Sequence, residues 1–179
     1  MTVGHRSELS SPIIGIVGWK NSGKTTLAVR LVEELTCRGL RVATIKHAHH
    51  VLRLDEKGTD SARHRAAGAQ QVAVVSGRRW AVMTEGPEPN FVDVVAKLEP
   101  CDLIVVEGYK SQPIYKVEAR RRDAHPGAGI AERDDKVIAI AADYAIDGAT
   151  IPVFELDDVA PIADFIVATF AIGALSGAS

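Results

Sequence analysis

The chain has 179 residues, 46% of them hydrophobic and 25% charged, which matches an ordinary soluble globular protein and suits one domain. The formal net charge of −2 excludes an overall attraction to nucleic acid or to an anionic membrane. Two cysteines, Cys37 and Cys101, are too few for a disulfide framework and do not form a zinc-ligand pattern, so we expect reduced thiols.

The two ends of the chain, residues 1–11 and 173–179, are rich in small and polar residues. We expect them to be flexible tails around a single domain over residues 12–172. Residues 1–12 lack the cationic start and apolar core of a secretory signal. The apolar stretch 159–175 is shorter than the ~20 residues of a spanning helix and is interrupted by Pro161 and Asp164. These features predict a cytoplasmic protein.

Short apolar runs recur along the chain, at residues 13–17, 42–45, 72–75, 103–106, 137–141 and 151–154. Such runs without alternation indicate strands that are covered on both faces. Helical spacing of apolar residues lies between them, in segments 25–38, 91–98 and 162–170. This alternation predicts an α/β fold with a mostly parallel, twisted sheet and helices on both faces, and the glycine-rich motif at residues 18–25 makes it P-loop NTPase-like.

Two segments depart from this pattern. Residues 71–76 and 79–84 are predicted to form a hairpin that turns around Gly77, and residues 115–121 alternate apolar and polar side chains as a further strand. We therefore expect one antiparallel edge of the sheet, on which a second copy of the chain can pair.

The strongest motif is G-x-x-x-x-G-K-[ST], placed between an apolar strand and an amphipathic helix. Its glycines let backbone N–H groups approach phosphate oxygens, and the helix N-terminus adds partial positive charge. Lys24 is expected to bridge the outer phosphates and Thr25 to ligate magnesium, while Thr26 is either a helper or an ordinary helix residue. The motif consists of Gly18, Trp19, Lys20, Asn21, Ser22, Gly23, Lys24 and Thr25, with a supporting role for Lys20.

A P-loop needs a further acidic group for magnesium or its waters. Glu107 ends the apolar run 103–106, and the carboxyl ends of parallel strands meet at the edge where phosphates bind. It is therefore predicted to point into the site, where Gly108 allows close approach. Asp60 has two interpretations that the sequence leaves open, because either it or Thr59 caps a helix, or Asp60 binds a magnesium water.

A cluster of basic residues follows the second strand at the same edge. Lys46 and His47 are expected to contact phosphate or a partner, while a structural role and metal binding by His47, His49 and His50 remain alternatives.

Several motifs together resemble the molybdopterin-guanine dinucleotide biosynthesis protein B (MobB) family. They are GWKNSGKTTL, KHAHH, KGTDSARHRAAGA, RWAVMTE, DLIVVEGYK and KVEARR, and they span roughly residues 12 to 170. The resemblance implies a homodimeric GTP-binding protein with weak, magnesium-dependent GTP hydrolysis. It implies an adaptor for a separate enzyme that attaches GMP to molybdopterin. It also assigns the site to Gly18–Thr25, the KHAHH segment, Asp60 and Glu107.

Recognition of the base is open, because the guanine-reading pattern N-K-x-D is missing. Asp143 ends a strand and is either a guanine contact or an ordinary turn residue, so the choice of GTP over ATP depends on the resemblance. Two other functions fit the P-loop. One is a small-molecule kinase with a lid that contains Arg120, Arg121 and Arg122, and the other is a metallochaperone GTPase that uses the histidine cluster.

Overall fold

The computed structural model describes residues 11–48, 58–124 and 128–173. Where the sequence predicts one domain, the chain divides into two compact units. The main unit comprises Met1–His47 and Val95–Ser179, and the inserted unit is Ala48–Val94. Of the predicted tails, residues 1–10 and 174–179 lie outside the described residues, but Ser11 is buried and its hydroxyl donates to the Cys101 carbonyl at 2.7 Å.

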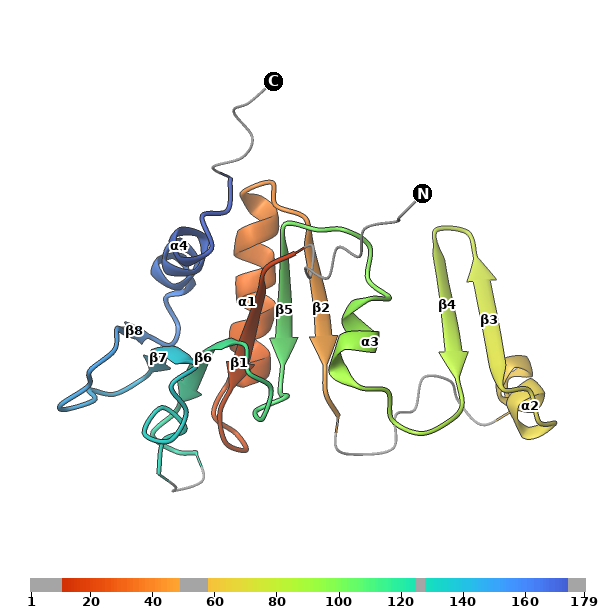
Figure 1. The fold of residues 1–179 in the computed structure, drawn as a ribbon, viewed down its shortest axis with the longest axis horizontal. Helices are drawn as coiled ribbons and strands as arrows, with labels where there is room; N and C mark the ends of the chain where they lie inside the picture. Colours follow the sequence, from red (N-terminus) through yellow and green to blue (C-terminus); the bar gives the residue numbers. More distant parts are fainter. Residues whose placement is uncertain (1–10, 49–57, 125–127, 174–179) are drawn as a thin grey trace, which may run out of the picture. The chain divides into compact units, whose positions relative to one another are not determined.

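The main unit is built on a six-stranded sheet in which every neighbouring pair of strands is parallel (Figure 1). The strand order is β2-β5-β1-β6-β7-β8. The expected mostly parallel fold is therefore confirmed. The strands are β1 (Ile13–Val17), β2 (Val42–Lys46), β5 (Leu103–Glu107), β6 (Tyr115–Arg120), β7 (Val137–Ala142) and β8 (Val153–Glu155).

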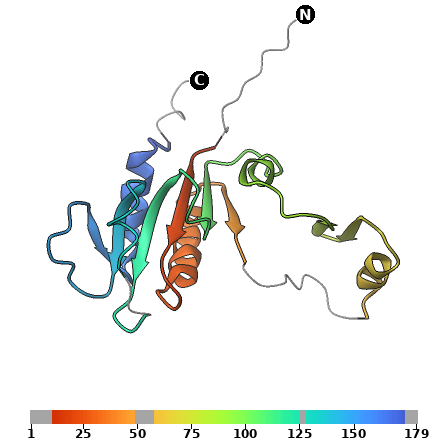
Figure 2. The same cartoon turned by 60° about the horizontal axis from the view of Figure 1, so that its bottom comes forward.

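The helices of the main unit share one hydrophobic core with this sheet. Helix α1 (Lys24–Cys37) lies along β1 and β5, and α4 (Val159–Thr169) packs beside it (Figure 2). Leu31 and Leu35 of α1 and Ile162 and Ile166 of α4 are fully buried there. Truncating one such leucine to alanine typically costs about 2–5 kcal/mol, so the predicted apolar stripe of α1 fixes the helix that begins at the P-loop.

The prediction of an antiparallel sheet edge is wrong. Strand β6 lies inside the main sheet and pairs in parallel with β1 and β7. Its alternating polar residues, Lys116 and Glu118, are only 1% exposed, because loops cover them and supply charged and backbone partners. The polar residues of β6 therefore face a buried layer of charged and hydrogen-bonded groups, and not solvent as the alternation suggests.

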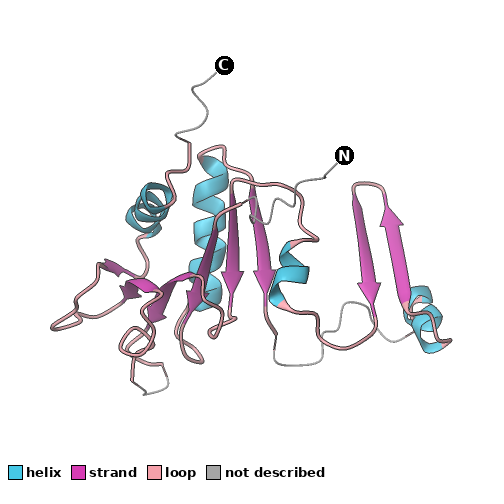
Figure 3. Cartoon of the chain, in the orientation of Figure 1, coloured by secondary structure: helices cyan, strands magenta, loops and turns pink. Residues whose placement is uncertain are grey.

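The predicted hairpin exists, but it forms a two-stranded antiparallel sheet of its own in the inserted unit (Figure 3). It consists of β3 (Gln71–Ser76) and β4 (Arg79–Thr84), preceded by α2 (Asp60–Ala66) and followed by α3 (Phe91–Val95). None of the described helices is long and apolar enough to cross a membrane.

Candidate functional site: a P-loop at the carboxyl edge of the sheet

The P-loop connects β1 to α1 through three residues with positive φ. These are Gly18 (152°), Asn21 (65°) and Gly23 (89°). A Cβ atom on Gly18 would stand 2.3 Å from the Ser22 hydroxyl and 2.5 Å from the Ala119 carbonyl oxygen. Only glycine fits this first position, which explains in contacts why the motif begins there.

Lys24 is folded back onto its own loop, where Nζ donates to the Trp19 carbonyl at 2.8 Å. Burial lowers the pKa of Lys24, and the positive charges of Lys110 and Lys46 lower it further, while Glu107 acts in the opposite direction. Three lysines therefore gather around one loop, and an arriving phosphate would relieve their mutual repulsion.

Glu107 and Thr25 meet as the sequence predicts. The Thr25 hydroxyl donates to Glu107 Oε1 at 2.7 Å, and Lys46 Nζ lies 3.1 Å from Glu107 Oε2 and 3.4 Å from Thr25 Oγ1. The Glu107 side chain is 15% exposed, so it is not a freely solvated residue at a strand end. β2 and β5 are hydrogen-bonded neighbours with Lys46 opposite Glu107, which is why residues 61 positions apart meet.

These residues suit a hydrated magnesium ion. The hydroxyl and the carboxylate are hard oxygen donors of the kind that magnesium prefers, and the Lys46 ammonium already shows that the position favours positive charge. Asp60, the third predicted ligand, belongs to the inserted unit and begins α2, whose N-cap is Thr59. Within residues 11–48, 58–124 and 128–173, no group of three or more His, Cys, Asp or Glu side chains could hold a metal.

His47, the residue after β2, lies against the turn that follows β5. His47 N–H donates to the Glu107 carbonyl at 2.9 Å, and its ring stacks on Tyr109 with centroids 4.3 Å apart. A Cβ on Gly108 would come within 3.1 Å of His47 Cβ, so the close approach expected at Gly108 is made by His47. His49 and His50 lie outside the described residues, so the metallochaperone hypothesis, which depends on them, stays a prediction.

A cavity of about 690 Å³ opens beside the P-loop, a volume in the range of small-ligand sites. It brings together most of the predicted phosphate-binding residues with three that sequence reasoning did not assign to the nucleotide. Arg30 is one turn further along α1, Arg121 follows β6, and Asp157 follows β8. The lining residues are Asn21, Ser22, Gly23, Lys24, Thr25, Thr26, Arg30, Arg121 and Asp157.

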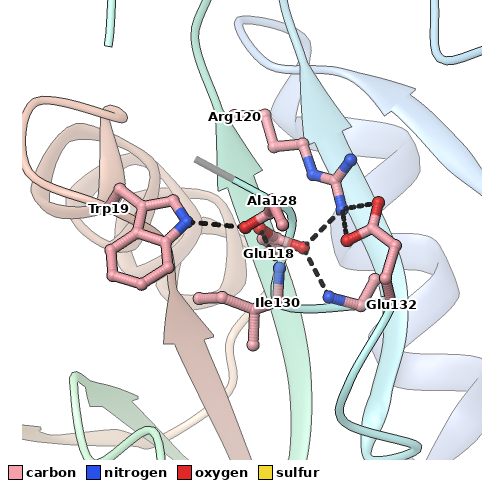
Figure 4. A network of polar contacts seen from close by, with 7 residues as sticks. Trp19, Glu118, Arg120, Ala128, Ile130 and Glu132 are labelled. Atoms are coloured by element: carbon pink, nitrogen blue, oxygen red, sulfur yellow. Dashed lines mark hydrogen bonds and ion pairs between the residues drawn. The ribbon is translucent and has the colours of Figure 1, made fainter. Parts of the chain in front are cut away.

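Trp19 does not line this cavity but ties the P-loop to a distant segment (Figure 4). Its indole N–H donates to the Ala128 carbonyl at 3.0 Å, and Lys110 Nζ stands 4.2 Å from the ring centroid. Lys20 is exposed at the tip of the loop. Trp19 thus holds the loop in shape rather than facing the cavity, and Lys110 is a nearby cation that the sequence did not single out.

The segment that Trp19 reaches is fixed by a buried carboxylate. Glu118 accepts hydrogen bonds from the N–H groups of Ile130 and Ala131 at 2.8 and 2.9 Å, and it pairs with Arg120 at 2.8 Å (Figure 4). Arg120 also pairs with Glu132 at 3.0 Å. Arg120 is therefore held in this network, whereas Arg121 lines the cavity.

Comparison with known proteins identifies the family. The sequence matches the family model for molybdopterin guanine dinucleotide synthesis protein B, MobB, over residues 13–143. The chain belongs to the MobB family. It is 39% identical over 158 residues, 87% of each chain, to the molybdopterin-guanine dinucleotide biosynthesis adapter protein of Haemophilus influenzae. The Escherichia coli protein of that name is 37% identical over 161 residues, 87% of this chain and 91% of its own.

MobB structures confirm the fold. A solved MobB homolog from Bacillus stearothermophilus aligns with a TM-score of 0.68 at 27% identity, and covers 89% of this chain and 97% of its own. The resemblance read from the motifs is thereby confirmed. The region that matches the MobB model includes Lys24, Glu107 and Asp143, and it ends before Asp157.

The last sequence candidate, Asp143, has a local partner. It follows β7, and its Oδ1 accepts the Arg122 backbone N–H at 2.8 Å. It is not among the residues that line the cavity. Its role toward the base stays a prediction.

Proposed function

We propose that this protein binds GTP and magnesium in the P-loop cavity and acts as an adapter in molybdopterin-guanine dinucleotide biosynthesis. In this role it presents guanine nucleotide to a separate guanylyltransferase, in the cytoplasm. The main support is the cavity itself, because the P-loop residues Lys24 and Thr25 line it, and Thr25 also bonds Glu107, which is not among the lining residues. The names of the H. influenzae and E. coli relatives support the biosynthetic role.

Each part of the P-loop has a physical task in this proposal. Backbone N–H groups and Lys24 neutralise the charge on the phosphates, and the N-terminus of α1 adds its partial positive charge. Thr25 and Glu107 would hold the magnesium ion and its waters, and the ion would supply further neutralisation of the outer phosphates. Lys46, which now pairs with Glu107, is the charge that magnesium would replace there.

Hydrolysis of the bound nucleotide is proposed to be weak. Glu107, whose carboxylate contacts the P-loop residue Thr25, is engaged by Thr25 and Lys46 rather than free to orient a water. Asp60 is on the inserted unit, and its side chain is 90% exposed. Without a positioned water or an added cationic finger, P-loop proteins turn over slowly.

The test is calorimetric titration with GTP and magnesium. Lys24→Ala should weaken binding at least ~100-fold, because a charged contact to the phosphates is worth several kcal/mol inside a partly desolvated site. Lys97→Ala, at an exposed lysine that does not line the cavity, is the matched control. Equal affinity of the Lys24→Ala variant and the wild type for GTP would exclude the P-loop cavity as the nucleotide site.

The adapter role needs a separate readout. Adding the wild-type protein to the purified guanylyltransferase should raise the rate of GMP transfer to molybdopterin, and adding Lys24→Ala should not. If both variants stimulate the transfer equally, the protein acts on its partner without its nucleotide.

We also propose that the protein is a homodimer joined through the β3–β4 hairpin. Val75 pairs with Trp80 and Ala73 with Val82 across one face of this hairpin, and Val75 and Trp80 are 78% and 73% exposed. A hairpin of two strands is marginal alone, and a second copy offers the same apolar face and free strand edges. Trp80→Lys should therefore convert a dimer to a monomer in sedimentation experiments. Val29→Lys, which charges an exposed apolar position on α1, should not.

A further inference from the structure

The cavity extends beyond what the phosphates of a nucleotide need. Its P-loop end is formed by residues 21–26, and its remaining lining consists of Arg30, Arg121 and Asp157. A nucleoside attached to phosphates in the P-loop can extend toward these three side chains, because they line the same cavity. They are therefore candidates to distinguish one base from another.

Asp157 is the only carboxylate among the described residues that line the cavity. It lies beyond β8, at the carboxyl edge where parallel sheets bind ligands. Its Oδ1 is 2.7 Å from Arg30 Nη1 and 3.7 Å from Arg121 Nη2. In the described part of the chain, no hydrogen bond or ion pair uses Oδ2. Two guanidinium groups thus orient the carboxylate and leave one oxygen able to accept.

The hydrogen-bonding groups of the purine bases determine which base the Asp157 carboxylate can bind. An ionised carboxylate only accepts hydrogen bonds, and arginine only donates them. Guanine presents two adjacent donors, N1–H and the N2 amino group, whereas adenine has an acceptor at N1. We propose that Asp157 reads the guanine base through these two donors, and that Arg30 and Arg121 hold its carboxylate in position. This inference rests on the proposed binding of GTP in the P-loop cavity.

Asp143, the acid predicted from sequence for this task, is placed less well for it. One of its oxygens is used by the Arg122 backbone N–H at 2.8 Å, and its side chain does not line the cavity. The two aspartates make different predictions for the same substitution, so one experiment separates them.

The experiment replaces a hydrogen-bond acceptor by a donor on the protein, with Asp157→Asn, and a donor by an acceptor on the base, with XTP in place of GTP. In Asp157→Asn, the amide oxygen can keep the place of Oδ1 against Arg30, which turns the amide NH2 to the place of Oδ2. Xanthine carries a C2 carbonyl where guanine has its amino group, so the amide NH2 can donate to xanthine O2, whereas it meets the guanine amino group with a second donor. Competition titrations with GTP, XTP and ATP should show GTP affinity falling about 10- to 100-fold and XTP affinity rising. The fall stays below the ~10⁴-fold discrimination of a site built to hydrogen-bond a substrate N–H or O–H, because the Asp157 side chain is 53% exposed.

Asp158→Asn is the matched control. This residue is next in the same loop, is exposed and does not line the cavity, so its variant should keep the wild-type preference for GTP. Thermal melts followed by circular dichroism should coincide for both variants, since neither side chain is buried.

Three outcomes would overturn the inference. They are an equal loss of GTP and XTP affinity in Asp157→Asn, the exchange of preference appearing in Asp143→Asn instead, and a wild type that binds ATP as well as GTP. Each of these is compatible with nucleotide in the P-loop cavity. A wild type that binds no nucleotide, or binds it independently of Lys24, would instead defeat the proposed function, and the inference would fall with it.

Discussion

Replacing Glu118 with glutamine tests whether the buried carboxylate next to the P-loop holds the segment around residues 128–132. The substitution keeps the shape of the side chain and changes only its hydrogen bonding. Glu118 Oε1 accepts from Ile130 N–H, and Oε2 accepts from Ala131 N–H and from Arg120. Glutamine has one accepting oxygen and one donating NH2 group. At least one N–H donor therefore faces another donor, whichever way the amide is turned.

The size of the effect follows from these contacts. A hydrogen bond to a charged group contributes about 1.5–3 kcal/mol, and the variant loses one or two of the three. Because the side chain is 1% exposed, water cannot replace them. We expect the free energy of unfolding to fall by about 3 kcal/mol. For a chain of this length the melting temperature should then fall by roughly 6–12 °C.

Urea denaturation and calorimetry measure this loss, and Glu132→Gln is the control. Glu132 pairs with the same Arg120, but its side chain is 54% exposed, so its loss should cost less than about 1 kcal/mol. Amide hydrogen exchange of Ile130 and Ala131 should accelerate in Glu118→Gln and not in the control. If both variants lose the same small amount of stability, the buried network does not hold this segment.

Two further substitutions test the P-loop bend and an acid-sensitive ion pair. Gly18→Ala should abolish nucleotide binding and cost at least 2 kcal/mol (an order-of-magnitude expectation for strained backbone), because its Cβ would collide with the Ser22 hydroxyl and the Ala119 carbonyl. Asp134→Asn should lower the free energy of unfolding by about 3–5 kcal/mol at neutral pH, because it deprives the buried Lys116 of its carboxylate at 2.8 Å. Partial burial raises the pKa of Asp134, but hydrogen bonds, first from Lys116, outweigh this and leave it lowered. The stabilising contribution is therefore complete above about pH 4, the ordinary carboxyl pKa, and is lost as the pH falls through the lowered value, so the variant and the wild type should converge in acid.

The Gly18→Ala and Asp134→Asn predictions each have a control measurement. Ser22→Ala alone should be nearly neutral for stability, since the Ser22 hydroxyl is buried without a hydrogen-bond partner among the described residues. In the double variant Gly18→Ala/Ser22→Ala, only part of the stability lost in Gly18→Ala should return, because the collision with the Ala119 carbonyl remains. Full recovery would show that the contact with the Ala119 carbonyl costs no stability. For Asp134→Asn, a stability difference from the wild type that stays constant down to pH 2 would contradict the pairing.

Most strands of the main sheet could be predicted because each is a recognisable apolar run in the sequence. A parallel strand buried on both faces must be apolar throughout, so β1, β5 and β7 are visible in the sequence as continuous runs. β6 is different, since Lys116 and Glu118 are polar yet buried. Sequence alone does not show that Asp134 and the Ile130 N–H will fold over them, so the alternation was assigned to a sheet edge.

The candidate site divides in the same way. Lys24 and Thr25 belong to a local motif, and Glu107 follows from the rule that parallel strands end at a common edge, so all three could be predicted from the sequence. Asp157 belongs to no motif. Its carboxylate is oriented by Arg30, which is 127 positions away in the chain. Only the packing of α1 beside the β8–α4 connection brings the two together, and that packing is a property of the whole core.

The inserted unit has a consequence for how this family can change. The chain leaves the main unit at His47 and returns at Val95, and both junctions are held, the first by its bond to the Glu107 carbonyl and the second by burial of Val95. Between such fixed points, the entropy of closing a loop grows only with the logarithm of its length, and doubling that length costs about 0.6 kcal/mol. Segment 48–94 can thus lengthen, shorten or exchange its surface over evolutionary time at little cost to the nucleotide-binding sheet. The surface of this segment can therefore diverge while the P-loop stays the same.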